Sequence, residues 1–144
     1  MTQYTKPLPT PDDFDKPYWT ALKKHELRMQ KCLDCGEIWF PPNPVCPACL
    51  SHNHEWIKLS GKGKVWSWVF FHQLYFPSFS DEIPYNVVAV KLDEGPLMTS
   101  NMVECKDEDI RCDMRVKVFF DDVTDLVTLP KFRPDSLLVA ERIS

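Results

Sequence analysis

The chain has 144 residues, of which 44% are hydrophobic, 12% aromatic and 26% charged, so it is globular and neither disordered nor collagen-like. Its length allows one domain of ordinary size or two very small ones. The formal net charge is -4 and the sequence pI is about 5.5. That is the wrong sign for a domain whose affinity comes from neutralising phosphates, and we therefore expect no nucleic-acid partner.

Nothing in the chain has the pattern of a membrane or export segment. The first 30 residues lack an apolar run and contain four acidic side chains, Asp12, Asp13, Asp15 and Glu26. The stretches without Asp, Glu, Lys or Arg, such as Val65 to Ser80, are all shorter than the roughly 20 mostly apolar residues of a membrane-spanning helix. We expect a cytoplasmic protein with no membrane contact.

A short amphipathic helix is predicted near the amino terminus, over Lys16 to Glu26, within an arm-and-helix segment of residues 1–28. Asp15 is a plausible N-cap, and Pro17 suits the first helical turn. Tyr18, Trp19 and Leu22 then form an apolar stripe at helical spacing. A helix this short is marginal alone, so the stripe must pack either on the protein's own core or on a partner.

Four of the six cysteines form two C-x2-C pairs separated by ten residues. They are Cys32, Cys35, Cys46 and Cys49. Two such turns that face each other offer four thiolates in tetrahedral geometry, which predicts a zinc ribbon over residues 29–58. A closed set of four cysteines leaves no open coordination position, so the Zn²⁺ is expected to be structural. Iron is the alternative metal, because the spacing is also similar to that of a rubredoxin.

The remaining candidates for chemistry are weak. Cys105 and Cys112 stand in an acidic segment with no adjacent base, and we expect both to be small buried hydrophobic residues. His52 and His54 follow Cys49 and are interpreted as loop residues. The chain contains no H-E-x-x-H, P-loop, G-x-S-x-G or G-x-G-x-x-G motif, so no catalytic constellation is predicted.

From Lys64 onward the sequence predicts about five short strands. The first ends at Phe71 and is apolar on both faces, which indicates a strand covered on both sides. The others are expected at 86–92, 97–103, 115–120 and 123–129, with Asp121 and Asp122 as the last hairpin turn. Five strands with one excursion at 104–114 fit a small closed barrel of the OB type over residues 59–144. The predicted class is mainly β: an N-terminal helix, a zinc ribbon and a five-stranded OB-fold barrel.

A set of short motifs, in order, resembles one family along nearly the whole chain. They are a helix with a Trp, Lys31-Cys32-x-x-Cys35-Gly36, Phe40-Pro41-Pro42, Cys46-Pro47-x-Cys49, Gly61-Lys-Gly63-x-Val65, Pro84-Tyr85-Asn86-Val87-Val88-Ala89, Leu92-Asp93-Glu94-Gly95-Pro96 and Pro130-x-Phe132-Arg133-Pro134. This order is similar to that of the thiolase-associated proteins, which were long catalogued as a domain of unknown function and combine a rubredoxin-like zinc ribbon with an OB-fold. One departure is Cys112-Asp113-Met114, where a small apolar residue, a Gly and a Met are expected.

The resemblance implies a non-catalytic small subunit of a thiolase-type or acyltransferase-type complex. Such a subunit docks on the catalytic dimer and helps to bind or channel acyl-CoA, and the aromatic side chains here would suit a bulky aromatic or steroid-like acyl group. The helix stripe of Tyr18, Trp19 and Leu22 is the candidate partner surface. The candidate acyl-CoA residues are aromatic walls beside cations for the phosphates, and they are Tyr75, Phe76, Phe79, Tyr85, Lys131 and Arg133.

Two other functions remain open at this stage. A zinc ribbon followed by an OB-fold also occurs in nucleic-acid-binding modules, and a four-cysteine iron site would make the protein an electron carrier. A red colour would identify iron, salt-dependent affinity would identify a nucleic-acid binder, and co-purification with a thiolase-like chain would identify the auxiliary subunit.

Overall fold

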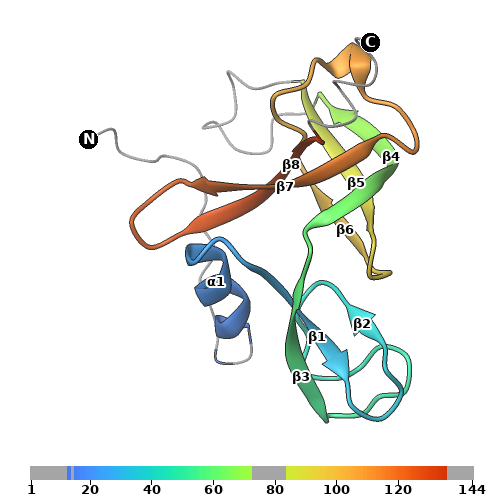
Figure 1. The fold of residues 1–144 in the computed structure, drawn as a ribbon, viewed down its shortest axis with the longest axis vertical. Helices are drawn as coiled ribbons and strands as arrows, with labels where there is room; N and C mark the ends of the chain where they lie inside the picture. Colours follow the sequence, from blue (N-terminus) through green and yellow to red (C-terminus); the bar gives the residue numbers. More distant parts are fainter. Residues whose placement is uncertain (1–12, 14, 73–83, 136–144) are drawn as a thin grey trace.

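Two antiparallel sheets and one helix make up the protein in the computed structural model, which describes residues 13, 15–72 and 84–135 (Figure 1). The predicted mainly β class, with a helix, a ribbon and an OB-fold, is confirmed. The elements in chain order are α1 (Lys16–Lys23), β1 (Leu27–Cys32), β2 (Ile38–Trp39), β3 (His54–Leu59), β4 (Lys62–Phe71), β5 (Tyr85–Leu92), β6 (Leu97–Ser100), the 3-10 turn η2 (Asp107–Asp109), β7 (Arg115–Asp122) and β8 (Thr128–Pro134).

Helix α1 begins at Lys16, as predicted, but ends at Lys23 instead of Glu26. The amide of Glu26 donates to the carbonyl of Ala21 at 2.9 Å, and the amide of His25 donates to that of Leu22 at 2.9 Å. This pair of bonds is a Schellman cap, which requires a left-handed residue, and His25 takes that conformation with φ 60°. The helix therefore stops one turn earlier than its apolar spacing indicates.

The first sheet is the ribbon, with strand order β2-β1-β3. β1 pairs with β3 along its whole length, from Leu27 opposite Leu59 to Cys32 opposite His54. His54 thus belongs to a strand and not to a loop. The two C-x2-C turns lie at the end of this sheet that is far from α1 (Figure 1).

The second sheet has the order β6-β5-β4-β7-β8 and curls so that its two edge strands approach each other. A single parallel bridge joins Met102, just after β6, to Phe132 of β8. Two backbone bonds accompany it, from the Val103 amide to the Phe132 carbonyl at 2.8 Å and from the Phe132 amide to the Asn101 carbonyl at 2.9 Å. The OB-fold is therefore a curled half-barrel joined at one bridge, and not the fully closed barrel that was expected.

The last hairpin differs from the prediction. Asp121 and Asp122 lie inside β7, and the final strand is Thr128–Pro134 in place of residues 123–129. The turn is formed instead around Thr124, whose hydroxyl accepts the amides of Leu126 at 3.2 Å and Val127 at 3.0 Å. β8 is an edge strand, which tolerates the missing amide of a proline, so the chain stays in the sheet through Pro130.

The main core is continuous between the two sheets. Its fifteen buried members include Tyr18 and Leu22 of α1, Met29 of β1 and Phe132 of β8, together with Leu27, Leu59, Val65, Val88, Val90, Leu92, Met98, Met102, Ile110, Met114 and Val116. The cluster crosses both boundaries of the proposed 1–28, 29–58 and 59–144 segments. The helix and the near half of the ribbon thus share one apolar core with the OB sheet.

Two glycines allow the close strand contacts where the ribbon joins the OB sheet. A Cβ on Gly61, which has φ 77°, would lie 2.5 Å from a methyl group of Val118, and one on Gly63 would lie 2.4 Å from the carbonyl oxygen of Lys91. Neither position accepts a side chain without moving a neighbouring strand. The Gly61-x-Gly63 motif therefore reflects packing of β4 against β5 and β7.

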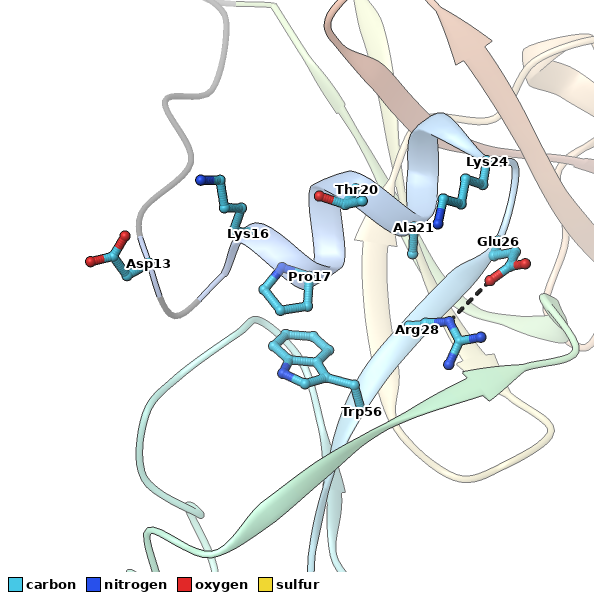
Figure 2. Close-up of a pocket in the computed structure, with 9 residues that line it drawn as sticks. All are labelled: Asp13, Lys16, Pro17, Thr20, Ala21, Lys24, Glu26, Arg28 and Trp56. Carbon is cyan, nitrogen blue, oxygen red and sulfur yellow. Dashed lines mark hydrogen bonds and ion pairs between the residues drawn. The ribbon is translucent and has the colours of Figure 1, made fainter.

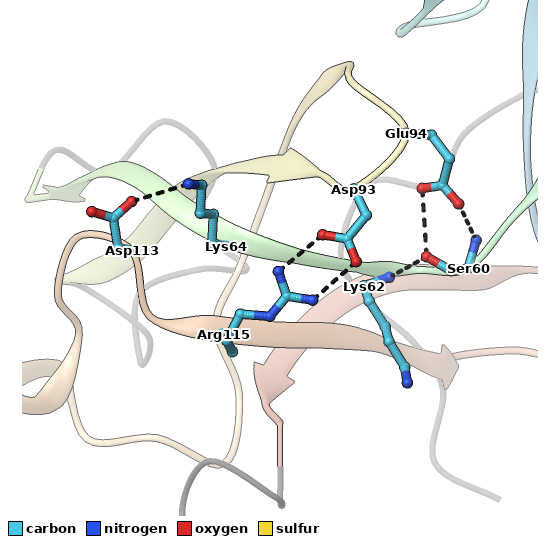
Figure 3. A network of polar contacts seen from close by, with 7 residues as sticks. All are labelled: Ser60, Lys62, Lys64, Asp93, Glu94, Asp113 and Arg115. Carbon is cyan, nitrogen blue, oxygen red and sulfur yellow. Dashed lines mark hydrogen bonds and ion pairs between the residues drawn. The ribbon is translucent and has the colours of Figure 1, made fainter.

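Polar contacts reinforce the same junction (Figure 3). The guanidinium of Arg115 donates to both carboxylate oxygens of Asp93 at 2.9 Å each, and Glu94 accepts the backbone amide of Ser60 at 2.8 Å. Because Asp93 and Glu94 form the turn between β5 and β6, these bonds tie that turn to β7 and to the start of β4.

Candidate metal centre and partner surface

The four predicted metal ligands meet at the far end of the ribbon. The sulfur atoms of Cys32, Cys35, Cys46 and Cys49 all lie within 4.8 Å of one another. The Sγ atoms of Cys32 and Cys49 are 3.5 Å apart, and those of Cys35 and Cys46 are 3.6 Å apart. Four sulfurs at about 2.3 Å from one Zn²⁺ in a tetrahedron would be about 3.8 Å apart. The cluster therefore has the dimensions of a zinc site.

Backbone amides of the two turns point at the sulfurs. The amides of Asp34 and Cys35 each lie 3.4 Å from the Sγ of Cys32, and the amide of Ala48 lies 3.4 Å from the Sγ of Cys46. Gly36 permits the first turn with φ 82°. These donors stabilise thiolates, which are the form that binds metal.

The electrostatics of the cluster call for a cation. Burial raises the pKa of the Cys32 thiol, but the backbone amides of Cys35 and Asp34, together with hydrogen bonds from the neighbouring thiols, bring its pKa down to about 7. The amide of Ser51 lowers the pKa of Cys49, yet the neighbouring thiols and burial raise that pKa to about 12. Four thiolates in so small a space repel one another unless a bound metal compensates their charge. The residues fit a closed, structural Zn²⁺ site with no position for substrate.

A buried glutamine connects the metal end of the ribbon to its sheet. Gln30 of β1 is 1% exposed, and its side-chain amide exchanges two hydrogen bonds of 2.8 Å with the backbone of Asn43. Its nitrogen also lies 3.1 Å from the Nε2 of His54. This arrangement fixes the loop that leads to Cys46. It could not be predicted from the sequence, because the two partners are 13 residues apart.

The helix stripe divides between the core and the surface. Tyr18 is 3% exposed and Leu22 is fully buried in the protein's own core, which favours the core alternative for these two residues. Burial also raises the pKa of the Tyr18 hydroxyl well above its usual value. Trp19 is half-buried, and its ring meets that of Tyr18 edge to face at 5.1 Å. Of the stripe, Trp19 is the side chain with exposed surface.

The predicted acyl-CoA residues do not form one described site. Tyr75, Phe76 and Phe79 lie outside the described residues. Tyr85 is the first residue of β5, and its ring contacts Phe71 at 5.4 Å. Lys131 and Arg133 lie within β8, not after the last strand as expected. Lys131 is ion-paired with Asp121 at 2.6 Å, and Arg133 with Glu104 at 2.7 Å.

An apolar surface lies on the outer face of β4 and β5, and of its members the predicted site residues included Tyr85 alone. Val88 is buried and pairs with Trp68, so the alternate pair of Val69 and Val87 is on the opposite, outer face. Val69 is 54% exposed, and Trp66, at the bulge of β4, is 57% exposed. The prediction that both faces of this strand are covered is therefore wrong. We call Trp66, Val69, Phe71, Tyr85 and Val87 the β4–β5 outer patch.

The two remaining cysteines are not both buried as expected. Cys112 is exposed, with its Sγ 3.7 Å from the carbonyl oxygen of Trp66, and Cys105 is half-buried against the core. Both belong to the excursion between β6 and β7, where the chain turns at Glu104 and Asp113 with positive φ. In the described part of the chain, no helix has the length and apolar character needed to span a membrane.

Comparison with known proteins gives the same two parts. Residues 19–55 match the rubredoxin-like zinc ribbon domain of ChsH2, and residues 56–121 match its C-terminal OB-fold domain. A DUF35 domain-containing scaffold protein of Methanocaldococcus jannaschii is 37% identical over 104 residues, covering 71% of this chain and 73% of the relative. The chain belongs to the DUF35 family.

Other relatives are subunits of larger assemblies. A probable enoyl-CoA hydratase alpha subunit of Thermomonospora curvata is 34% identical over 83% of this DUF35 chain, which spans 37% of that relative's length. The benzoylsuccinyl-CoA thiolase subunit BbsA of Thauera aromatica is 28% identical, covering 82% of this chain and 74% of BbsA. A solved structure described as Ltp2-ChsH2(DUF35) aldolase superposes with a TM-score of 0.76 at 31% identity, covering 88% of this chain and 98% of the other.

Proposed function

We propose that this DUF35 protein is a non-catalytic subunit that docks on the catalytic subunit of an acyl-CoA enzyme, and that the partner is a thiolase-type dimer. The observation that carries the proposal is the β4–β5 outer patch. Exposed apolar patches on an otherwise charged surface are typical of protein interaction sites. The metal cluster, by contrast, has the closed geometry of a structural site and has no role in the chemistry.

The relatives support the general part of this proposal. Those matched over most of their length are named as scaffold proteins or as a thiolase subunit, and the structural neighbour is described as part of an aldolase. The hydratase alpha subunit is much longer than this chain, so hydratase activity is not assigned to it. Taken together, these names support an auxiliary subunit of an acyl-CoA enzyme.

The patch has the chemistry of an interface core. Trp66 is large and more than half exposed, and aromatic residues of this kind are the usual anchors of protein interfaces. A charged pair lies close to it in the chain fold: the amino group of Lys64, two residues before Trp66, lies 3.7 Å from the Asp113 carboxylate. We expect the catalytic subunit to cover the patch with an apolar surface of its own and to leave Lys64 and Asp113 exposed to solvent.

The finer part of the proposal concerns substrate. We propose that Tyr85, together with Tyr75, Phe76 and Phe79, supplies an apolar wall for the pantetheine arm or acyl group of a CoA thioester in the complex. Lys131 and Arg133 would have to release Asp121 and Glu104 before either could hold a phosphate. Replacing Tyr85 by Ala in the assembled complex is expected to raise the Michaelis constant for acyl-CoA, and an unchanged constant would limit this protein to a scaffold.

The docking proposal is tested by co-purification of the protein with thiolase-type chains from the same organism. Val69→Asp places a charge at the centre of the patch, and we expect it to abolish the complex. Leu126→Asp is the matched control, because Leu126 is 85% exposed at the tip of the β7–β8 turn and away from the patch. Equal co-elution of both variants would contradict docking through the patch. Tight, salt-dependent binding of nucleic acid would instead favour the nucleic-acid alternative.

A further inference from the structure

A second concave site lies between α1 and the ribbon sheet, away from the β4–β5 outer patch. It has a volume of about 550 Å³ and is lined by Asp13, Lys16, Pro17, Thr20, Ala21, Lys24, Glu26, Arg28 and Trp56. This volume is within the range of small-molecule sites. Figure 2 shows the Trp56 ring beneath Pro17 at one end and the Glu26–Arg28 pair at the other, below Lys24.

Positive charge collects in this pocket although the whole chain is acidic. Lys16, Lys24 and Arg28 line it, and Lys58 stands opposite Arg28 in the register of β1 and β3. Glu26 accepts a hydrogen bond of 3.0 Å from the Nε of Arg28. The pKa of the Glu26 carboxyl lies below its usual value, mainly because of this hydrogen bond. The positive charges of Arg28, Lys58 and Lys24 lower it further. Two carboxylates, Asp13 and Glu26, thus stand against the three cations of the lining and Lys58 beside them, which leaves net positive charge for a further anion.

We propose that this pocket binds the adenosine phosphate part of a nucleotide, with the phosphates at Lys24 and Arg28 and the base against Trp56. The pocket offers both parts of that ligand's chemistry: cations suited to phosphate at one end and an aromatic wall at the other. Thr20 adds a hydroxyl on the lining between Lys16 and Lys24. An acidic peptide would pair with the cations but would not require an aromatic side chain such as Trp56. A nucleotide therefore explains more of the residues that line the pocket.

Two sources carry this chemistry, namely the phosphorylated adenosine end of CoA and a free adenine nucleotide. The CoA source rests on the proposed function, whereas the site itself does not. Lys24 and Lys16 are exposed, whereas Arg28 is paired with Glu26. Lys131 and Arg133 are each paired with a carboxylate, so the α1 pocket, which offers two exposed lysines besides the Glu26–Arg28 pair, is the better place for phosphates.

Binding is measured by calorimetry on the zinc-loaded full chain, with CoA, adenosine 3′,5′-bisphosphate, ATP, pyrophosphate and pantetheine as probes. CoA and at least one adenine nucleotide are expected to bind, pyrophosphate to bind more weakly and pantetheine not to bind. Equal affinity for CoA and adenosine 3′,5′-bisphosphate with weaker ATP identifies the CoA end. Equal affinity for ATP identifies a general nucleotide site.

Substitutions at three exposed or half-buried positions are expected to change the nucleotide affinity in different directions. Lys24→Ala is expected to weaken binding about tenfold, the size of one charge-assisted hydrogen bond. Glu26→Gln removes the resident anion and is expected to tighten binding. Lys106→Ala removes the same charge from an exposed site on the OB side and should leave affinity unchanged.

Three results would overturn the proposal. They are the absence of saturable nucleotide binding by the native chain, equal affinity of the Lys24→Ala and Lys106→Ala variants, and pyrophosphate binding as tight as that of the nucleotides. Because the isolated chain is used, these results leave docking on a thiolase-type partner unaffected, and failure of docking leaves them unaffected in turn.

Discussion

The far end of the ribbon is stabilised in a different way from the OB sheet. In the described residues, the far end has a buried cluster of three residues, Cys32, Trp39 and Cys46, two of which are metal ligands. The main core has fifteen buried members that reach from α1 to β8. A three-residue cluster removes too little apolar surface from water to offset the ordering of its loops. Bound metal therefore stabilises the far end of the ribbon, whereas apolar packing stabilises the OB sheet and α1.

Loss of the metal should give the largest and most local effect. Metal binding to such cysteine turns contributes on the order of 10 kcal/mol, and Cys46→Ser removes one of its four ligands. Elemental analysis should find one Zn²⁺ per native chain and none in the variant. Hydrogen exchange should then be fast at residues 32–53 of the variant, while residues 86–92 of β5 stay protected. A metal-free native preparation with protected ribbon amides would falsify the assignment of a structural zinc.

Removal of a central apolar side chain should have the converse, global effect. Phe132 is fully buried where β8 meets the bridge to Met102. Phe132→Ala is expected to lower the free energy of unfolding by about 4 kcal/mol, through lost burial and the cavity that remains. Urea denaturation measures the loss, and elemental analysis of the folded variant should still find its zinc. A loss under about 1 kcal/mol would mean that the two edges of the sheet are not held through this residue.

The link between the metal end of the ribbon and the ribbon's own sheet can be weakened without touching either core. Gln30→Leu keeps a side chain of similar size but removes both hydrogen bonds to the backbone of Asn43. We expect a loss of about 2 kcal/mol, and faster metal release to a chelator than from the native chain. His52→Ala, an exposed change in the same region, serves as the control and should release metal at the native rate.

The smallest expected effect is the pH dependence of the Asp93–Arg115 pair. The hydrogen bond from Arg115, above all, holds the pKa of Asp93 below its ordinary value of about 3.9. The pair therefore stabilises the fold fully above about pH 4, and this contribution is lost as pH falls through the lowered pKa. The side chains are 44% and 33% exposed, so Asp93→Asn should cost at most about 1 kcal/mol at pH 7. The deficit relative to the native chain should vanish in strong acid; a deficit that persists there would point to packing.

Features set by short-range spacing were predictable from the sequence. The metal ligands followed from two C-x2-C pairs, and the helix start followed from Asp15 and Pro17. The helix end was missed because His25, and not a glycine, takes the left-handed cap. The last turn was missed because Asp121 and Asp122 are typical turn residues, whereas Thr124 forms the turn.

Features set by distant partners were not predictable. The ion pairs that occupy Lys131 and Arg133 depend on how β8 folds against β7 and against the segment after β6. The exposed side of β4 could not be separated from its buried side, because Trp and Val occur on both. The α1 pocket joins residues of α1, β1 and β3, and its cations are too far apart in sequence to form a recognisable patch.

The attachment of α1 to the last hairpin has a consequence for synthesis on the ribosome. His25 stacks on Phe120 with ring centroids 5.1 Å apart and lies 3.0 Å from the Asp122 carboxylate, and Lys23 donates to the carbonyl of Thr124 at 3.2 Å. At about 5–20 residues per second, the first helix waits on the order of ten seconds for these partners to be made. During that interval Tyr18 and Leu22 have no finished core, so a nascent chain exposes its apolar stripe until the β7–β8 hairpin has been synthesised.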